Sequence, residues 1–433
     1  MPRRVAGDHV DVCVVGSGFA GLAAAERLTA EGASVLVLDA GGDVGTSPSP
    51  APSVQVHGDA DFDVEDNRVI ALGGTSAKWN GVASRLEPAV LAEWPLPAGA
   101  LDPYLAQAEA WLGVSGAPAA TGSEPARRST LLPATTTLLP HHLPSLEPFA
   151  PVVVPFAFVD GGPRRLLVHD LPRVLAAGVD LRTATWVRSV RPAGRRRPAE
   201  VHGLDATGQP CVVRARRVIL AVGVVEAVRI LATSASTGRS RLLGTGINAH
   251  PRRRTTVRRA PELMGLRGVL RSYRIGDEFA ARGLGRVLLD VNYMEATPMI
   301  DVTVEQRVVV GNRLRLGADG GLVAELWLDG RDHATVAAAD ALITDVAAVL
   351  PGAGPTGAIV TRWFHPAGGC PMAATEAAGV VDHDGQVFGA PGVYVAGAAT
   401  FPTAGAGNPT LTIVALAIRQ ADHIAGELSK GNL

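Results

Sequence analysis

Residues 10–21 read Val-Asp-Val-Cys-Val-Val-Gly-Ser-Gly-Phe-Ala-Gly, and residues 22–30 continue with good helix formers. The apolar run 10–15 predicts a buried strand that turns directly into a helix. Gly16 permits the tight turn, Gly18 lets the backbone approach a pyrophosphate, and Gly21 lets the helix pack against the strand. The stretch predicts a Rossmann-like α/β domain.

A second strand, 34–38, ends at Asp39, which is placed to accept a hydrogen bond from an adenosine ribose hydroxyl. Three spaced glycines alone occur at many tight turns. Together with the two strands and Asp39 they indicate dinucleotide binding, without distinguishing FAD from NAD.

Composition excludes several classes of protein. With 433 residues, 47% hydrophobic content and a net charge of −1, the chain is globular, long enough for two domains, and unsuited to nucleic acid. Its three cysteines are far apart, so neither disulfides nor a metal site are expected. We find no signal peptide and no run of about 20 apolar residues, and we expect a cytoplasmic protein without a membrane span.

The loop after residue 68 carries the first family resemblance. It reads Arg68-Val-Ile-Ala-Leu-Gly73-Gly-Thr-Ser-Ala-Lys78-Trp-Asn-Gly81, an extended run that breaks into small residues. This loop resembles the one that lies against the flavin in glucose-methanol-choline (GMC) oxidoreductases, which oxidise alcohols with FAD. Lys78 occupies the position where pyranose-oxidase-like members carry a histidine bonded to the flavin, so FAD is expected to be noncovalent. The Lys78 ammonium either lies near the flavin or extends into solvent.

The end of the chain carries the chemistry. His365 opens His-Pro-Ala-Gly-Gly-Cys370, which resembles a GMC motif and the similar string of cholesterol oxidases, and Asn408 precedes Pro409-Thr410 at the start of a predicted helix. An alcohol loses hydride readily only when a base takes its hydroxyl proton. The resemblance implies that His365 is this base and that Asn408 orients the substrate oxygen. Cys370 is expected to be a buried packing residue.

The resemblance implies an FAD-binding domain made of residues 1–114, 165–255 and 361–433, and an antiparallel-sheet substrate domain made of 115–164 and 256–360. The residues placed against the cofactor are Gly16, Gly18, Phe19, Ala20, Gly21, Asp39, Ala40, Arg68, Gly73, Gly74, Thr75, Lys78, Asn80, Gly81, Val82, Val187, Ala221, Gly223, Glu226, Ala396, Gly397, Asn408, Pro409 and Thr410.

Three features of the middle of the chain have alternative interpretations. His250, in an element similar to the family's Gly-x-Asn-x-x-x-His-Pro, is expected to be structural. The arginine-rich run that begins at Arg252 is either a solvated strand and hairpin, which we favour, or a docking face for an anionic substrate or a partner protein. Glu305 or Gln306 either points into the substrate space or is an ordinary polar residue on a strand, which we also favour.

The resulting functional prediction is oxidation of CH–OH to a carbonyl by hydride transfer to flavin N5. The expected substrate is a small-molecule alcohol, a sugar or glycoside in a metabolic or biosynthetic pathway, with O2 or another electron acceptor. The alternatives are a sterol-like or polycyclic alcohol, or a dehydrogenase subunit that passes electrons to a protein. Familiar GMC members are longer, so we expect an open site that admits bulky alcohols.

Overall fold

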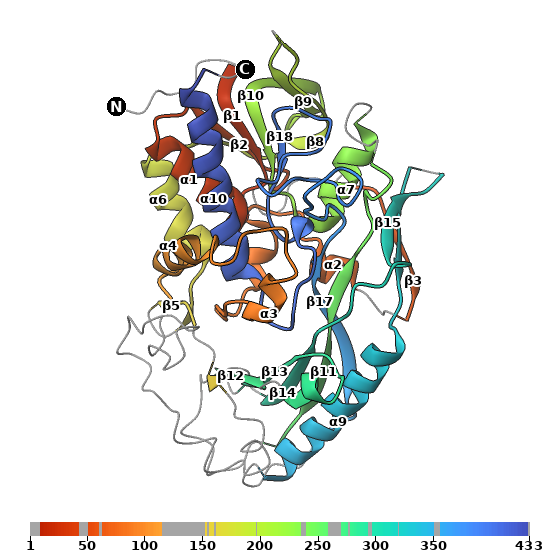
Figure 1. Cartoon of the computed structure of the whole chain (residues 1–433). Coiled ribbons are helices and arrows are strands. Elements are labelled where there is room, and N and C mark those ends of the chain that lie inside the picture. Colours follow the sequence, from red (N-terminus) through yellow and green to blue (C-terminus); the bar gives the residue numbers. More distant parts are fainter. Residues whose placement is uncertain are drawn as a thin grey trace.

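The computed structural model of the chain describes residues 9–42, 51–59, 63–114, 152–153, 156–159, 162–195, 197–234, 240–258, 270–275, 278–292, 297–318, 320–349 and 356–431. An α/β body contains both ends of the described chain, and a second sheet backed by a long helix lies below it (Figure 1). The substrate-region segment 115–151, on which the expected openness of the site depends, lies outside the described residues.

The central sheet of the α/β body is built on parallel strands. Strands β7 (Asp180–Arg182), β2 (Val35–Leu38), β1 (His9–Val15) and β10 (Pro210–Leu220) lie in this order, and β18 (Val393–Val395) pairs in parallel with the end of β10. Antiparallel strands β9 (Ala199–Leu204) and β8 (Trp186–Arg191) extend the sheet beyond β10. The predicted α/β class and its Rossmann-like part are confirmed.

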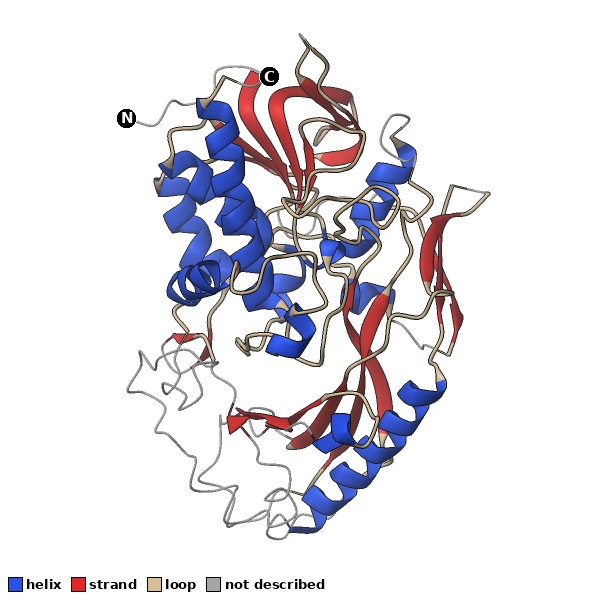
Figure 2. Cartoon of the chain, in the orientation of Figure 1, coloured by secondary structure: helices blue, strands red, loops and turns tan. Residues whose placement is uncertain are grey.

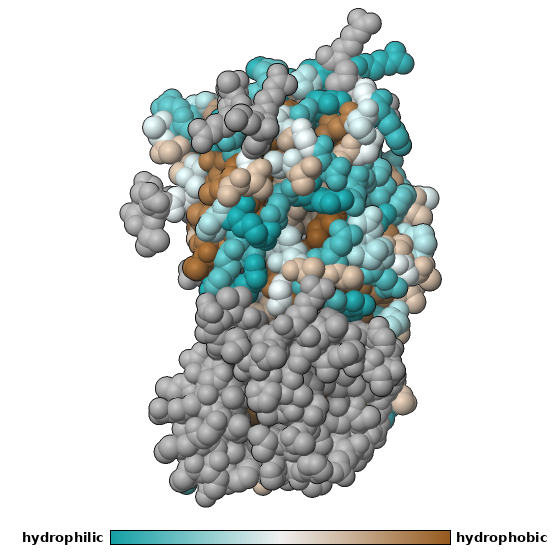
Figure 3. All heavy atoms as spheres, turned by 90° about the vertical axis from the view of Figure 1, so that its left-hand side faces the viewer, coloured by the Kyte–Doolittle hydropathy of each residue, from teal (hydrophilic) through white to brown (hydrophobic). Residues whose placement is uncertain are grey.

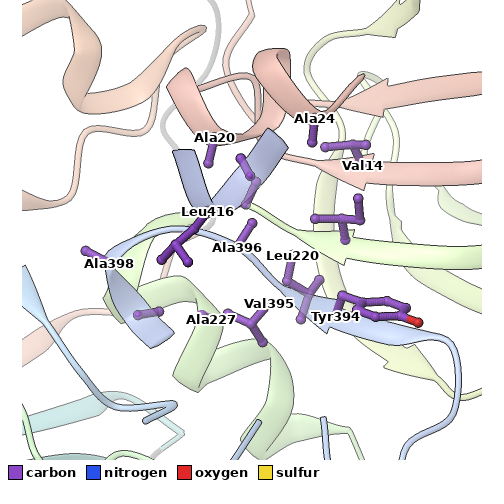
Figure 4. Close-up of a cluster of buried hydrophobic side chains, with 14 of the residues drawn as sticks. Val14, Ala20, Ala24, Leu220, Ala227, Tyr394, Val395, Ala396, Ala398 and Leu416 are labelled. Carbon is purple, nitrogen blue, oxygen red and sulfur yellow. The ribbon is translucent and has the colours of Figure 1, made fainter. Parts of the chain in front are cut away.

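Helices enclose this sheet on both sides (Figure 2). Helices α1 (Phe19–Ala30), α10 (Thr410–Ser429), α4 (Asp102–Leu112) and α6 (Leu171–Ala176) gather on one side, and α7 (Gly223–Thr233) lies on the other. Small side chains such as Ala20, Ala24 and Ala227 let helix backbones approach the strands, and they pack against Leu220 and Val395 in one apolar cluster (Figure 4).

The second sheet is antiparallel. Its strands follow the order β17 (Val360–Ala367), β11 (Asn248–Thr256), β14 (Met299–Val304), β13 (Val287–Asn292), β12 (Leu270–Ile275) and β4 (Val152–Val153). Helix α9 (Gly330–Val349) packs on this sheet and closes a separate apolar core. The antiparallel sheet that the resemblance implied is thus present.

Smaller elements complete the fold. A three-stranded sheet has the order β15 (Arg313–Leu316), β16 (Leu322–Leu326) and β3 (Val54–Gly58), and β5 (Phe158–Val159) pairs with β6 (Gly162–Pro163). The short helices are α2 (Val64–Asn67), η1 (Gly74–Lys78), α3 (Pro88–Leu91), η3 (Leu166–Asp170), α8 (Glu278–Ala281) and η5 (Ala398–Thr400).

Two of the predicted domain boundaries fall inside continuous strands. Strand β11 crosses the boundary at residue 255, β17 crosses the boundary at 361, and β3 joins the predicted FAD-binding segment to β16. The two regions therefore share strands, and the boundaries themselves stay a prediction.

The first arginines of the run lie on a strand, as the favoured interpretation has it, but the expectation that this strand is solvated is wrong. Strand β11 lies between β14 and β17, where Arg253 pairs with Asp340 and Arg254 pairs with Asp301. Arg252 is 7% exposed. A strand inside a sheet holds its side chains over neighbouring strands, so these cations meet protein partners instead of water. A docking face for a partner protein gains no support from these residues.

The helical side of the α/β body presents charged and polar side chains mixed with small apolar areas (Figure 3). None of the helices in the described ranges unites the length and the hydropathy needed to cross a bilayer.

Candidate functional site

A cleft of about 330 Å³ opens at the carboxyl ends of β1, β2 and β10, the edge where parallel sheets bind ligands. Most predicted site residues line it: Gly16, Gly18, Phe19, Ala20, Asp39, Ala40, Arg68, Gly73, Gly74, Thr75, Lys78, Asn80, Val187, Ala221, Gly223, Glu226, His365, Ala396, Gly397, Asn408, Pro409 and Thr410. These residues come from eight separate stretches of chain.

Three predicted cofactor residues lie outside the lining. Gly21 lies behind the cleft, where a Cβ would stand 1.9 Å from the Gly16 carbonyl oxygen, so its role is the predicted packing of helix on strand. The Gly81 carbonyl accepts a hydrogen bond from the Ala157 amide, and buried Val82 bridges to Phe156. Gly81 and Val82 therefore support the cleft wall from outside.

Two glycines of the turn after β1 have different reasons to lack a side chain. Gly16 has φ +100°, and a Cβ there would stand 2.4 Å from the Ala221 carbonyl oxygen. At Gly18 the nearest atom, the Gly73 carbonyl oxygen, would be 3.7 Å away. The protein itself needs glycine at 16, whereas Gly18 keeps open a space that faces the cleft.

Three helices begin at the cleft. The first residues of α1, α7 and α10 all line it, and no side chain caps their N-termini. Helix N-termini carry partial positive charge and free backbone amides, so the cleft is suited to an anionic ligand such as a pyrophosphate. Pro409 occupies the cap position and α10 starts at Thr410.

Asp39 is engaged by the protein. Its Oδ2 accepts hydrogen bonds from the Ser17 amide and hydroxyl at 2.7 and 2.5 Å, and its Oδ1 accepts one from the Gly41 amide at 2.7 Å. Burial raises the pKa of Asp39, while the bonds from Ser17 and Gly41 oppose that rise. The carboxylate thus fixes the glycine turn to the loop after β2, and its contact with a ribose stays a prediction.

Arg68 and Glu226 meet in a buried charge cluster. The Glu226 carboxylate pairs with both Arg68 and Arg229, and all three side chains are at most 7% exposed. Arg229 also donates to the Val187 carbonyl at 2.6 Å and lies 4.6 Å over the Trp186 ring. Because one carboxylate faces two guanidinium groups, this end of the cleft keeps a net positive charge.

Lys78 lines the cleft at its rim. Its ammonium pairs with the Asp66 carboxylate, and its side chain is 46% exposed. The carboxylate offsets the lysine charge, so the geometry favours the solvent-directed alternative over a dedicated flavin contact.

A bulge in β17 aims His365 at the cleft. Phe364 is opposite His250 but Ala367 is opposite Asn248, so β17 holds one extra residue at this point. His365 has φ +55°, a left-handed conformation that is rare outside glycine and is found at functional sites.

The bulge brings together two histidines that are far apart in the sequence. The Nδ1 atoms of His250 and His365 are 3.2 Å apart, and the rings are nearly perpendicular at 84°. Burial, followed by the charges of His250 and Arg252, holds the pKa of His365 well below 6.5. Burial and Arg252 also lower the pKa of His250, to about 4. Both imidazoles are neutral at physiological pH.

Asn408 offers an unused acceptor. The residue is 2% exposed, and its Nδ2 lies 3.4 Å from the Asn80 side-chain oxygen. Its Oδ1 is buried and has no hydrogen-bond partner among the residues that the structure describes. A buried polar atom without a partner is costly, so this oxygen is suited to a ligand donor.

Glu305 and Gln306 take structural roles and do not line the cleft. Glu305 pairs with Arg286 and Arg331. The Gln306 side chain accepts from the Ala249 amide at 2.8 Å and donates to the Trp327 carbonyl at 2.9 Å. The favoured interpretation, a polar residue of the strand region, fits both. Cys370 is fully buried, as predicted.

Sequence reasoning missed several lining residues. Ser17 and Trp186 adjoin predicted positions, and a polar residue inside a glycine turn was a signal for the first. Arg252 and Phe364 also line the cleft, with the Arg252 guanidinium 4.7 Å over the Phe364 ring. No sequence signal separated Arg252 from the arginines that follow it.

Comparison with known proteins matches two segments of the chain to family models. A family model described as GMC oxidoreductase matches residues 330–417, which include His365 and Asn408, and one described as an NAD(P)-binding Rossmann-like domain matches residues 14–65. The segment that carries His365 and Asn408 thus matches the GMC oxidoreductase family.

Three characterised relatives are similar in sequence. A C-glycoside 3-oxidase from Microbacterium trichothecenolyticum is 43% identical over 110 residues, and one from Arthrobacter globiformis is 54% identical over 54 residues. These matches span 21% and 10% of those relatives, and 24% and 12% of this chain. A paromamine 6'-oxidase from Streptomyces fradiae is 27% identical over 96% of this chain and 92% of its own length.

Solved structures of two oxidases share the fold. Formate oxidase from Aspergillus oryzae superposes with a TM-score of 0.70 at 17% identity, covering 98% of this chain and 100% of the other. Pyridoxine 4-oxidase from Mesorbium loti gives a TM-score of 0.67 at 16% identity, covering 95% and 98%.

Substituting the two turn glycines should have different effects, on stability at Gly16 and on FAD binding at Gly18. Gly16→Ala forces a left-handed alanine against Ala221 and should destabilise the fold by about 2 kcal/mol or more. Gly18→Ala should leave the stability of the FAD-free protein within about 0.5 kcal/mol but weaken FAD binding about tenfold or more, because the added methyl enters the cleft. Thermal unfolding and fluorimetric FAD titration measure both. A stable Gly18→Ala protein with unchanged FAD affinity would contradict the assignment of this space to the cofactor.

Proposed function

We propose that this chain is an FAD-dependent GMC oxidoreductase that oxidises a CH–OH group of a sugar or glycoside to a carbonyl, with His365 as the base. The observation that carries the proposal is the neutral His365 imidazole in the cleft, held at Nδ1 by His250. Asn408, with its unpartnered oxygen, lines the same cleft.

The lining residues fit FAD. The space beside Gly18 and the uncapped N-termini of α1 and α7 would hold the pyrophosphate, and Trp186 and Val187 would contact the adenine end. The N-terminus of α10, beside Asn408, would face the flavin. FAD bound there supplies the hydride acceptor. Lys78 stands where pyranose-oxidase-like members carry the histidine that is bonded to the flavin. Because this chain lacks that histidine, the cofactor is noncovalent.

The histidine pair defines which nitrogen can act as the base. When both rings are neutral, only one Nδ1 can carry the shared proton. His365 needs a free lone pair on Nε2 to accept the substrate proton, so its own proton sits on Nδ1 and is donated to His250. His250 then carries its proton on Nε2. Burial and the nearby Arg252 favour the neutral form of His365, so the base is available well below pH 7.

The named relatives support the substrate class and the acceptor. C-glycoside 3-oxidases and paromamine 6'-oxidase are named for oxidising glycosides or sugar derivatives. Because all three are named oxidases, we propose O2 as the electron acceptor.

Removing the base tests the central assignment. His365→Ala should slow anaerobic flavin reduction by a sugar about 10²- to 10⁴-fold, because no group then takes the hydroxyl proton. FAD content, measured by flavin absorbance, should stay at the wild-type level. A variant that loses FAD, or one that is reduced at the wild-type rate, would remove His365 from this role.

The role of His250 is tested by comparing a variant that removes the acceptor of the His365 Nδ1 proton with one that keeps an acceptor at this place. His250→Ala removes the acceptor for the His365 Nδ1 proton and should slow flavin reduction about tenfold or more, by analogy with other bases that lose their tautomer control. His250→Gln offers an amide oxygen at this place and should recover part of the loss. If the two variants lose activity equally, and the loss follows their decrease in thermal stability, then His250 contributes only to packing.

The pH dependence follows from the lowered pKa of His365. A base acts in its deprotonated form, so kcat/KM should stay level as the pH falls to 6.5 and decline only below it. The charged or titratable groups facing the pair are Arg252, which opposes protonation, and Glu305, which favours protonation of His250. An acid limb at or above pH 6.5 in initial-rate measurements would contradict the depressed pKa.

A further inference from the structure

One buried positive charge beside the proposed base has no carboxylate partner. Arg252 is 7% exposed and lines the cleft next to Phe364 and His365. Its Nε donates to the Thr303 hydroxyl at 3.0 Å, and its guanidinium covers the Phe364 ring. Among the described residues, no acceptor is bonded to its two terminal nitrogens, and no carboxylate lies within salt-bridge distance.

The two neighbouring arginines on β11 have carboxylate partners, so the missing partner is specific to Arg252 among the three. Arg253 binds both oxygens of Asp340 at 2.6 and 2.8 Å, and Arg254 binds both oxygens of Asp301 at 2.5 and 3.0 Å. Both side chains are more exposed than Arg252. The most buried of three consecutive arginines is thus the one that lacks a counter-charge.

Burying an unpaired charge costs several kcal/mol, and folds keep such groups where a ligand supplies the missing partner. The two terminal nitrogens of a guanidinium form a planar fork that matches the two oxygens of a carboxylate. Thr303 and Phe364 hold the other parts of this side chain, so the fork is fixed in place before a ligand arrives. The ring of Phe364 also excludes water from one face of the fork.

We propose that Arg252 is a specificity residue that binds a carboxylate of the substrate, so that acidic sugars or glycosides are preferred over neutral ones and cationic amino sugars are disfavoured. The inference rests on the proposed function and names the substrate class of the same site. The carboxylate belongs either to the sugar ring, as in a uronide, or to the group attached at the anomeric carbon.

Matched substrates test the preference. Anaerobic stopped-flow reduction of the FAD enzyme is measured with methyl glucoside, methyl glucuronide, 4-carboxyphenyl glucoside and methyl 2-amino-2-deoxyglucoside. One of the two carboxylates should give an apparent Kd about 10- to 100-fold lower than its neutral counterpart, as expected for a charge-assisted bidentate bond. The glucuronide and the carboxyphenyl glucoside distinguish the two positions of the carboxylate. The amino sugar should bind most weakly.

Variants of Arg252 separate binding from a structural role. Arg252→Met should abolish the preference for the carboxylate, and Arg252→Lys should keep only part of it because lysine has no fork. Since Arg252→Met removes an unpaired buried charge, its Tm should equal or exceed that of the wild type. Arg253→Met is the matched control: it leaves Asp340 without its partner and should lower the Tm, while the substrate preference stays unchanged.

Ligand-induced stabilisation gives a readout that is independent of turnover. Whichever carboxylate substrate is preferred should raise the Tm of the anaerobic wild-type protein but not that of Arg252→Met. If methyl glucoside reduces the flavin and both carboxylates bind no better than their neutral counterparts, the proposal is overturned while the proposed function stands. If Arg252→Met lowers the Tm as Arg253→Met does and keeps the wild-type preference, Arg252 is structural. If no sugar reduces the flavin, the proposed function falls and this inference falls with it.

Discussion

The close approach of two turns at the edge of the central sheet determines the rest of the structure. The turn after β1 and the turn after β10 meet where a side chain at Gly16 would overlap the Ala221 carbonyl, and Gly21 lets α1 pack onto the same turn. This contact places the first residues of α1 and α7 at one cleft. Residues from the opposite end of the chain, in the loop after β18 and in α10, complete the same cleft, so a binding site arises from segments nearly 400 residues apart.

The second sheet contributes the proton chemistry through one irregularity. A regular β17 would alternate its side chains strictly between the two faces of the sheet. The extra residue at the bulge changes that alternation at His365 and sets its ring against His250 on β11. Hydrogen bonds to β11 and the rigid Pro366 hold the strained backbone at His365. The His365 side chain therefore keeps a direction that a regular strand would not give it.

The parts of the molecule that depend on local sequence were predictable. The glycine turn, the strands beside it, and the pairing of His365 with a helix that starts after Asn408 all follow from short motifs. The contact between His250 and His365 was not predictable, because it joins residues 115 positions apart through a bulge that leaves no mark in the sequence. Arg252 was misread for a related reason. In a sequence, a run of arginines is typical of a solvent-exposed segment. Only the position of β11 inside a sheet shows which guanidinium is buried.

His250 and Arg252 are two residues apart on one strand, so their side chains share a face of the sheet. The electrostatic influence of Arg252 on both histidines means that selectivity and basicity have a common physical origin. A mutation that retunes the sugar preference at this position also changes the proton affinity of the histidine pair. A substitution at 252 therefore acts on substrate binding and on the histidine pair at once, whereas changes in distant loops act on neither.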